Sequence, residues 1–598
     1  MQKVVTNYPE FNPFLQPSSS LGIITHFIEY LNPNQPLHIM ANGNPATAND
    51  FFGHPRGLST LFFTELWERF SYYGMRALLV LFMTAEALGD NPGLGFSVGE
   101  ATAIYGIYTF FVYVLSLPGG WVADNIWGQK KAVFIGGCII AAGHFSMAVP
   151  TTTFFFIGLA LIVIGTGLLK PNVSSMVGDI YPEGGARRDA GFSIFYMGIN
   201  LGAILGPLLC GLLGEGYNWH YGFSLAGFGM VLGLISYKIG DKYLEGAGDL
   251  DENFTKEEVN RKSKIFYTVS SILIAVVVVF GFLQSSGAIN VALDVLAQNL
   301  GIVAVIITLL FFGYIIFFGG HTQQEKKRLG VIFWLFILAA LFWSGFEQAG
   351  SSLNLFAAEL TNRAAGPSEF LGGYGSFILT AILAIPIGWY TLKAFRRDDL
   401  WQVAKIALVA SAVGVLAFFY WVFTQIGSGW IIPASTLQLI NPTFIVIFAP
   451  IFGFMWTWLA SKNANPSIPV KFGLGLFGLA AGFFVLAWGS ANASSTSLVS
   501  PAWLIVTYFL HTVGELCLSP VGLSSMTKLA PKNRVSQMMG IWFVAAALGN
   551  LKAGLLAGQL ETLAPSGLFQ SVALIVGGGG IVALLAAPPI RKLMGDVE

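Results

Sequence analysis

Runs of about 20 residues that are almost free of charge recur along the whole chain, and they constrain its fold more than any other feature. Each run is long enough to cross a hydrocarbon layer of about 30 Å as a helix. Of the 598 residues, 55% are hydrophobic and 10% are charged, whereas an ordinary soluble domain has about 25% charged residues. The sequence therefore predicts membrane-spanning helices.

The apolar runs fall into two sets of six, separated by an insertion. The first set is predicted at 58–87, 101–123, 131–149, 152–177, 190–213 and 221–238. The insertion carries two further runs, 266–285 and 298–318. The second set is predicted at 330–358, 436–460, 470–489, 501–525, 536–560 and 568–590. This pattern predicts an all-α polytopic membrane protein in which two six-helix bundles surround a central cavity.

Two more apolar runs, 373–392 and 402–426, lie between the first two helices of the second set. They bring the prediction to about 14–16 spans. Because the first of them contains Pro386 and Gly388, the alternative is that this hydrophobic hairpin lies along the membrane interface.

Composition shifts divide the chain into six predicted segments. A polar stretch at 1–57 reads as a cytoplasmic tail, too interrupted for a secretory signal, and Met40 is a second candidate start. The other segments are a first bundle at 58–238, a linker with the inserted pair at 239–329, the first helix of the second bundle at 330–358, the additional hairpin at 359–430 and the remainder of the second bundle at 431–598.

The positions of lysine and arginine predict the orientation. Basic clusters recur in alternate loops, for example Arg187-Arg188 and Lys326 to Arg328, whereas the loops 286–297 and 490–500 carry neither residue type. Because positive charge marks cytoplasmic loops, we expect a multi-pass protein of the cell inner membrane with both termini in the cytoplasm.

Charge and cysteine content exclude several classes of function. The 31 basic and 31 acidic residues cancel, so no overall field attracts nucleic acid. The three cysteines, Cys138, Cys210 and Cys517, lie in separate apolar runs, and their spacing predicts neither a disulfide nor a metal site. The sequence identifies no protein partner, and a monomer is compatible with it.

A stripe of polar residues marks the first span. In TELWERFSYYGMR these residues fall at helical offsets of 0, 3, 4, 7, 8 and 11; they are Glu65, Glu68, Arg69, Tyr72, Tyr73 and Arg76. At 3.6 residues per turn they occupy an arc of about 140°. Since an ionised side chain at bilayer depth costs about 2.5–3.5 kcal/mol, we expect the stripe to face the cavity.

Three isolated charges, Lys170, Glu347 and Glu515, interrupt other spans. With the four charges of the stripe they would cost about 20 kcal/mol if each faced lipid alone, so they must neutralise one another or a ligand. The cations all belong to the first half and the isolated acids to the second. This asymmetry suggests a zwitterionic substrate with its carboxylate on the first half and its ammonium on the second. The alternative is that the charges are permanent pairs that only fix the bundle.

Several strings, in the same order, resemble the proton-dependent oligopeptide transporters, the peptide branch of the major facilitator superfamily. TELWERFSYYGMR resembles the ExxERFxYY motif of the first span. The other strings are GTGLLKPNVSSMVGDIY, FYMGINLGAILGP, LINPTFIVIFAPIF, GELCLSPVGLS and the loop GGWVADNIWGQKK. The resemblance covers residues 55–560 and implies the major facilitator fold, proton-coupled import of di- and tripeptides across the inner membrane, and no cofactor beyond protons as the coupling ion. The inserted pair resembles the two extra helices of bacterial members.

The resemblance also implies roles for individual residues. Proton coupling is assigned to Glu65, Glu68 and Arg69, which exchange partners with Lys170, and to Glu347. Arg76 and Glu347 are expected to form an ion pair that closes the outer side. The peptide carboxylate is expected at Arg69, Arg76 and Lys170, the amino end and backbone at Glu515, Asn200 and Asn441, and the side-chain pockets at Tyr72, Tyr73, Tyr113, Trp343 and Trp542. The aromatic residues can equally be core or interface residues.

The chain departs from the family pattern in two places. Animal members carry a protonating histidine in the second span, which residues 101–123 lack. Carboxylates must then carry the protons, and His144, His220 and His511 are expected to be packed or hydrogen-bonded residues. The 373–426 pair has no place in the usual pattern.

Other functions remain open on the sequence. Relatives of similar architecture carry nitrate, amino acids or glucosinolates, and a channel or a nutrient sensor can reuse the scaffold. An intramembrane protease is disfavoured because GxSG, GxGD and HExxH motifs are missing from the spans. We therefore expect a transporter and not an enzyme.

Overall fold

The computed structural model divides the chain into a unit of residues 1–53 and a compact unit of residues 54–598. It describes residues 51–364 apart from 52, 183, 184, 245 and 251–253, scattered positions between 376 and 395, and residues 402–425, 431–595 and 597. The predicted tail lies almost wholly outside the described residues. The description below concerns residues 54–598.

The first half of this unit consists of helices that match the six predicted spans. They are α2 (Gly57–Thr84), α3 (Val98–Val114) continued by α4 (Ser116–Val122) and a π-helical turn (Ala123–Trp127), α5 (Gln129–Met147), α6 (Thr152–Asp179), α7 (Gly185–Gly214) and α8 (Trp219–Gly240). The inserted pair follows as α9 (Lys256–Ser285) and α10 (Leu293–Phe318).

The second half begins with a helix that is broken once. It runs as α11 (Gln323–Phe346), a 3-10 segment (Glu347–Gly350) and α12 (Ser352–Glu359). The remaining helices are α15 (Gln402–Gln425), α16 (Ile440–Ser461), α17 (Ile468–Gly489), α18 (Ala502–Leu529), α19 (Val535–Ala557) and α20 (Pro565–Met594). The predicted run at 402–426 is thus helical, whereas the run at 373–392 lies largely outside the described residues.

Twelve helices or helix runs among the described residues are long and apolar enough to cross a membrane. The helices α2, α5 and α15 are not among the twelve. All three coincide with predicted runs and are 28, 19 and 24 residues long, and α2 carries the polar stripe. Twelve and three give 15, within the predicted 14–16 spans of an all-α polytopic membrane protein.

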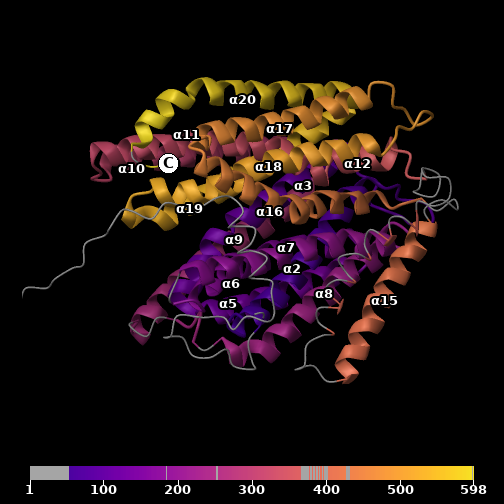
Figure 1. The fold of residues 1–598 in the computed structure, drawn as a ribbon, viewed down its shortest axis with the longest axis horizontal. Coiled ribbons are helices and arrows are strands. Elements are labelled where there is room, and N and C mark those ends of the chain that lie inside the picture. The colour runs from indigo at the N-terminus through magenta and orange to yellow at the C-terminus, as the bar shows by residue number, and fades with distance from the viewer. Residues whose placement is uncertain are drawn as a thin grey trace, which may run out of the picture. The chain divides into compact units, whose positions relative to one another are not determined.

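Figure 1 shows α2, α5, α6, α7 and α8 gathered together, with α11, α17, α18, α19 and α20 forming a second group. The halves meet where α3 packs on α19. A Cβ at Gly554 would lie 2.4 Å from the carbonyl oxygen of Thr102 and 2.8 Å from the Cα of Gly106. Only glycine fits there, so the backbones of the two halves are in direct contact.

Side-chain caps fix where several helices begin. Ser97 and Glu100 form a capping box at the start of α3, and Thr322 and Glu325 form another at the start of α11. Such caps satisfy backbone N–H groups that a helix leaves without partners. They define the first turn of two helices that carry candidate site residues, Tyr113 on α3 and Trp343 on α11.

Candidate functional site

The polar stripe of α2 is buried inside the protein. Glu65 and Glu68 are 0% exposed, Arg69 and Tyr72 are 5% exposed, and Arg76 is 7% exposed. Tyr73 is partly buried and its ring contacts that of Tyr72. The stripe therefore does not face acyl chains.

Arg69 lies between the two acids of its own helix. Its Nε atom is 2.7 Å from Oε1 of Glu65, to which it donates a hydrogen bond, and 3.2 Å from Oε2 of Glu68. Neither oxygen of Glu68 accepts a hydrogen bond from the described residues, and Oε2 of Glu65 accepts none either. Because a buried carboxylate without donors is costly, Glu68 is the acid in this cluster with the most to gain from a proton.

The helix α7 holds this cluster in place by packing closely on α2. A Cβ at Gly202 would lie 2.3 Å from the carbonyl oxygen of Leu66 and 2.7 Å from the Cβ of Arg69. Gly202, the second glycine in the string FYMGINLGAILGP, thus lets the two helices approach at the level of Arg69.

Lys170 of α6 contacts an aromatic ring instead of an acid. Its Nζ atom lies 3.9 Å from the centre of the Tyr113 ring, a favourable cation–π distance. No carboxylate of the described residues forms an ion pair with Nζ, although Glu68 and Glu65 are near enough to interact with it electrostatically. Tyr113 also faces Phe543 of α19, with ring centres 6.5 Å apart.

Arg76 connects the two halves through a buried ion pair. Its Nη2 atom lies 2.5 Å from Oε2 of Glu347, and its Nε atom donates to the hydroxyl of Tyr105 at 2.7 Å. Glu347 is 4% exposed and begins the 3-10 segment at the break between α11 and α12. The two residues predicted to close the outer side are therefore paired here, and their role as a gate stays a prediction.

Glu515 of α18 has an amide as its described polar partner. The side chain of Asn441 donates to Oε2 of Glu515 at 3.3 Å and to Oγ1 of Thr512 at 3.0 Å. Glu515 also lies near enough to interact electrostatically with Tyr73 and Tyr196 of the first half. This acid thus faces the contact between the two halves.

The remaining predicted residues are less closely associated with the charges. The side chain of Asn200 is 5% exposed and donates to the carbonyl of Tyr196 in its own helix. Trp343 packs where α11 meets α19, beside Gly549, and its indole N–H has no described partner. Trp542 is packed against Phe472 and Gly522 within the second half, and the structure does not bring it to the charged cluster.

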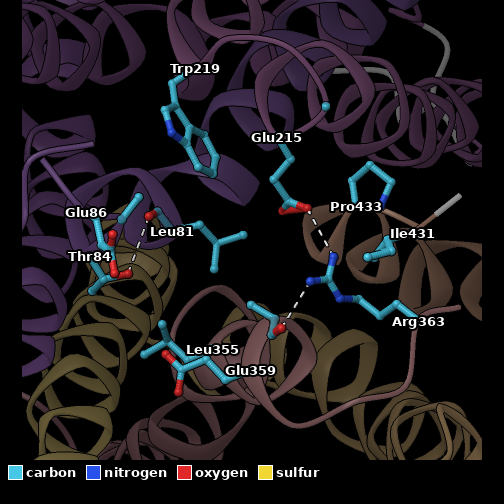
Figure 2. Close-up of a pocket in the computed structure, with 13 residues that line it drawn as sticks. Leu81, Thr84, Glu86, Glu215, Trp219, Leu355, Glu359, Arg363, Ile431 and Pro433 are labelled. Carbon is cyan, nitrogen blue, oxygen red and sulfur yellow. Dashed lines mark hydrogen bonds and ion pairs between the residues drawn. The ribbon is translucent and has the colours of Figure 1, made fainter. Parts of the chain in front are cut away.

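A second contact between the halves was missed by the sequence analysis. Glu215, directly after α7, accepts backbone N–H groups of the second half: Ala434 donates to Oε1 at 2.5 Å and Ser435 to Oε2 at 3.0 Å. Arg363 lies 3.6 Å from Oε1 of Glu215 (Figure 2). Its guanidinium also donates to the carbonyls of Ile432 and Ala358. The available signal was that Glu215 is the only acid in the short connection 214–218.

Glu215 and Arg363 line a cavity of about 470 Å³ together with Glu86, Trp219 and Glu359 (Figure 2). Burial raises the pKa of Glu215, although the N–H groups of Ser435 and Ala434 and the charge of Arg363 act in the opposite direction. Burial also lowers the pKa of Arg363. The ion pair between Glu215 and Arg363 is therefore partly shielded from water.

Two more polar contacts join the halves at the same end of the helices. The N–H of Gly99, at the start of α3, donates to Glu561 at 2.6 Å, and the side chain of Asn354 in α12 donates to the carbonyl of Ala77 at 2.8 Å. Between described residues, the hydrogen bonds and ion pairs that connect the two halves all lie at this end, where α2, α7 and α12 finish. We call it the Glu215 end.

Comparison with known proteins gives consistent matches. The model of the POT family matches residues 130–408 and 416–567. The chain is 37% identical to the peptide transporter YePEPT of Yersinia enterocolitica, over 93% of this chain and 98% of that protein. It is 34% identical to the di-/tripeptide transporter of Lactococcus lactis subsp. cremoris, over 92% and 99%. A crystal structure of a peptide transporter POT in complex with sulfate has a TM-score of 0.74 and 37% identity, covering 92% of this chain and 97% of that one.

Proposed function

The chain belongs to the POT family of transporters, and we propose on that premise that it imports di- and tripeptides together with protons. It is a multi-pass membrane protein. The relatives matched above are bacterial peptide transporters, and the proposal places this chain in the cell inner membrane with both termini in the cytoplasm. It requires no cofactor besides protons.

The observation that supports coupling to protons is the buried environment of the Glu68 carboxylate. This carboxylate is fully buried beside Arg69 and has no hydrogen-bond donor among the described residues. The seven membrane charges consist of three cations and four carboxylates, so full ionisation leaves one excess negative charge. One proton on Glu68 removes that excess and also supplies the buried acid with an O–H group that can donate a hydrogen bond.

The zwitterionic substrate follows from how the charges are divided. Arg69, Arg76 and Lys170 lie on the first half, and a guanidinium can bind a carboxylate through two parallel hydrogen bonds. On the second half, Glu515 is held by a neutral amide and retains capacity for a cation. A peptide with a charged carboxylate and a charged amino end can pair with the cations of the first half and with Glu515. Because such a peptide has no net charge, it leaves the net charge of the site unchanged.

Alternating access requires that one end closes while the other opens. The contacts Arg76–Glu347 and Glu215–Arg363 lie at the Glu215 end, which the proposed orientation makes the outer end. We propose that they form part of the outer closure and break when the transporter opens outward. Import is then complete when the peptide and its proton leave toward the cytoplasm.

Uptake of labelled dialanine into proteoliposomes tests this function. With an acid-outside proton gradient, the proposal expects accumulation above the equilibrium level, since each pH unit supplies about 1.4 kcal/mol per proton. A panel of di-, tri- and tetrapeptides and free amino acids then defines the length of the substrate. Collapse of the gradient with an ionophore is the matched control.

Two outcomes would contradict the proposal. Equilibration without accumulation would indicate a channel or an uncoupled carrier, and binding without flux would indicate a sensor. Preferential uptake of free amino acids or nitrate over peptides would keep the fold and the coupling but reject the substrate.

A further inference from the structure

The second half contains a basic cavity at the end of the helices opposite to the Glu215 end. It has a volume of about 700 Å³ and is lined by residues of α16, α17, α18 and α20. Its lining by described residues includes three cations, Lys471, Lys528 and Arg591, and no aspartate or glutamate. The peptide site proposed above uses none of these residues, so the cavity is a separate feature of the molecule.

Lys471 is the residue on which the argument depends. It is the fourth residue of α17 and is 8% exposed. Its Nζ atom lies 4.4 Å from the centre of the Trp456 ring on α16. Within the described part of the chain, no carboxylate forms an ion pair with this nitrogen. A nearly buried ammonium in a membrane helix normally has an anionic partner.

The surroundings of Lys471 favour an anion. Lys528 and Arg591 are exposed side chains with further interactions in the chain, and they add positive charge to the same cavity. The amino end of α17 begins at Ile468, next to Ser467, and its first N–H groups carry partial positive charge. Ser467, Ser524 and two asparagines supply neutral hydrogen-bond donors; the asparagines are Asn463 and Asn465.

The depth of the lining residues distinguishes a lipid from a free anion. Lys471, Lys528 and Arg591 lie within three residues of a helix end, which is about 5 Å along the helix. Phe452 and Leu516 lie 9 and 13 residues from the ends of α16 and α18, which is about 13–20 Å from those ends along the helices. Cations at headgroup depth above an apolar wall match the amphiphilic shape of a phospholipid.

We propose that this cavity binds the phosphate of an anionic phospholipid, with Lys471 as its principal ligand and the glycerol and acyl region against Phe452, Trp456 and Leu516. The proposed orientation places the cavity in the cytoplasmic leaflet, where basic residues beside membrane helices are commonly found. The inference concerns lipid binding and is independent of which substrate is transported.

Native mass spectrometry of the full-length protein tests the proposal with two probes, phosphatidylglycerol and phosphatidylcholine. We expect phosphatidylglycerol to be retained in preference, and Lys471→Met to reduce that preference by about fivefold, since one basic residue near the surface contributes about a fivefold affinity for anionic lipid. Lys471→Arg should keep most of it. The matched control is Lys462→Met, an exposed lysine directly after α16 that does not line the cavity.

Photo-crosslinking on the unmodified chain locates the lipid without any variant. A phosphatidylglycerol with a diazirine in its acyl chain should label peptides that contain Phe452, Trp456 or Leu516. An unchanged lipid preference in Lys471→Met, or labelling confined to other helices, would overturn the proposal. If inorganic phosphate or glycerol phosphate alone displaced the lipid at equal concentration, the anion site would stand and the lipid as its occupant would be rejected.

Discussion

The two halves hold their buried charges in different ways. In the first half, Glu65 and Glu68 share Arg69 on a single helix, so these ion pairs do not depend on the position of the other half. In the second half, Glu347 depends on Arg76 of the other half, and Glu515 has only the Asn441 amide as its described hydrogen-bond partner. From this difference we infer that the first half can store a proton by itself, and we propose that the acids of the second half respond to closure and to ligand.

The largest effect on uptake should come from Glu68→Gln in the cluster that Glu65, Glu68 and Arg69 form on α2. Glutamine resembles the protonated acid but cannot release a proton, so gradient-driven accumulation of dialanine should fall to the equilibrium level. Counterflow exchange, which needs no net proton movement, should persist in part. Both are measured in the same proteoliposomes. Retained uphill uptake would remove Glu68 from the coupling, and Glu100→Gln, an exposed capping residue of the first half, should behave as the unmodified protein.

Glu347→Gln should have the next largest effect because it removes the ion pair with Arg76 that connects the two halves. Arg76 would be left buried without its acid, and removal of one partner from a buried pair costs about 3–5 kcal/mol. The arrangement closed at the Glu215 end should lose population, and uptake should fall severalfold. Spin labels on the exposed residues Leu88 and Leu563, in a variant without native cysteines, report the change as a longer distance.

A second substitution sharpens this test. The double variant Arg76→Met with Glu347→Gln removes both charges, so it should recover part of the short distance that Glu347→Gln alone loses. Equal distances in the single and double variants would show that the ion pair does not hold the halves together.

Glu515→Gln should act on ligand binding more than on closure. An ion pair with a peptide ammonium is replaced by a neutral hydrogen bond, which costs about 1.5 kcal/mol or roughly tenfold in affinity. Competition assays with dialanine and its N-acetylated form measure the difference, which should be confined to the free amine. Equal losses for both peptides would place the amino end elsewhere.

Glu215→Gln should give the smallest effect, and it should depend on pH. Burial raises the pKa of Glu215 in the closed arrangement, and hydration on opening would return it toward its ordinary value. The closed arrangement then binds more protons between these two pKa values, so acidification through that window stabilises closure and a rise of pH above it removes this stabilisation. In the glutamine variant, the part of the pH dependence of the Leu88–Leu563 distance that comes from protonation of Glu215 should disappear. The rate of uptake should change by no more than about twofold.

The charged groups around Glu215 provide the controls for that measurement. Arg363, Glu86 and Glu359 are the other charged side chains among the described residues that line the same cavity. Glu86 is exposed, and its side chain forms no hydrogen bond or ion pair with a described residue of the second half, so Glu86→Gln should leave the distance at neutral pH unchanged. An identical pH profile in Glu215→Gln and the unmodified protein would exclude Glu215 as a titrating part of the closure.

The helices could be predicted from the sequence because the membrane imposes one rule on every span. An uncharged run of sufficient length must be helical, and each predicted span with described residues coincides with a helix. Boundaries were less predictable where a helix continues into water. The run predicted at 266–285 belongs to α9, which begins at Lys256, since its first turns are charged and lie outside any apolar window.

Pairing within the site was only partly predictable. The stripe of α2 was found because helical periodicity places its residues on one face. Lys170 was expected to exchange partners with the acids, and that role remains a prediction; in the structure its ammonium group lies over the Tyr113 ring. Glu215 and Arg363 were missed because charges next to spans are ordinary in a sequence, and only the fold brings them together.

The break in the first helix of the second half makes its acid part of a mechanical joint. Glu347 begins the 3-10 segment that separates α11 from the eight-residue α12. Tilting of α12 about the 3-10 segment would move Glu347 and Asn354 relative to α2. The side chain of Asn354 donates a hydrogen bond to the carbonyl of Ala77 in α2. Protonation chemistry and rigid-body movement would then be a single event, so that a change in either one is transmitted to the other without an intervening loop.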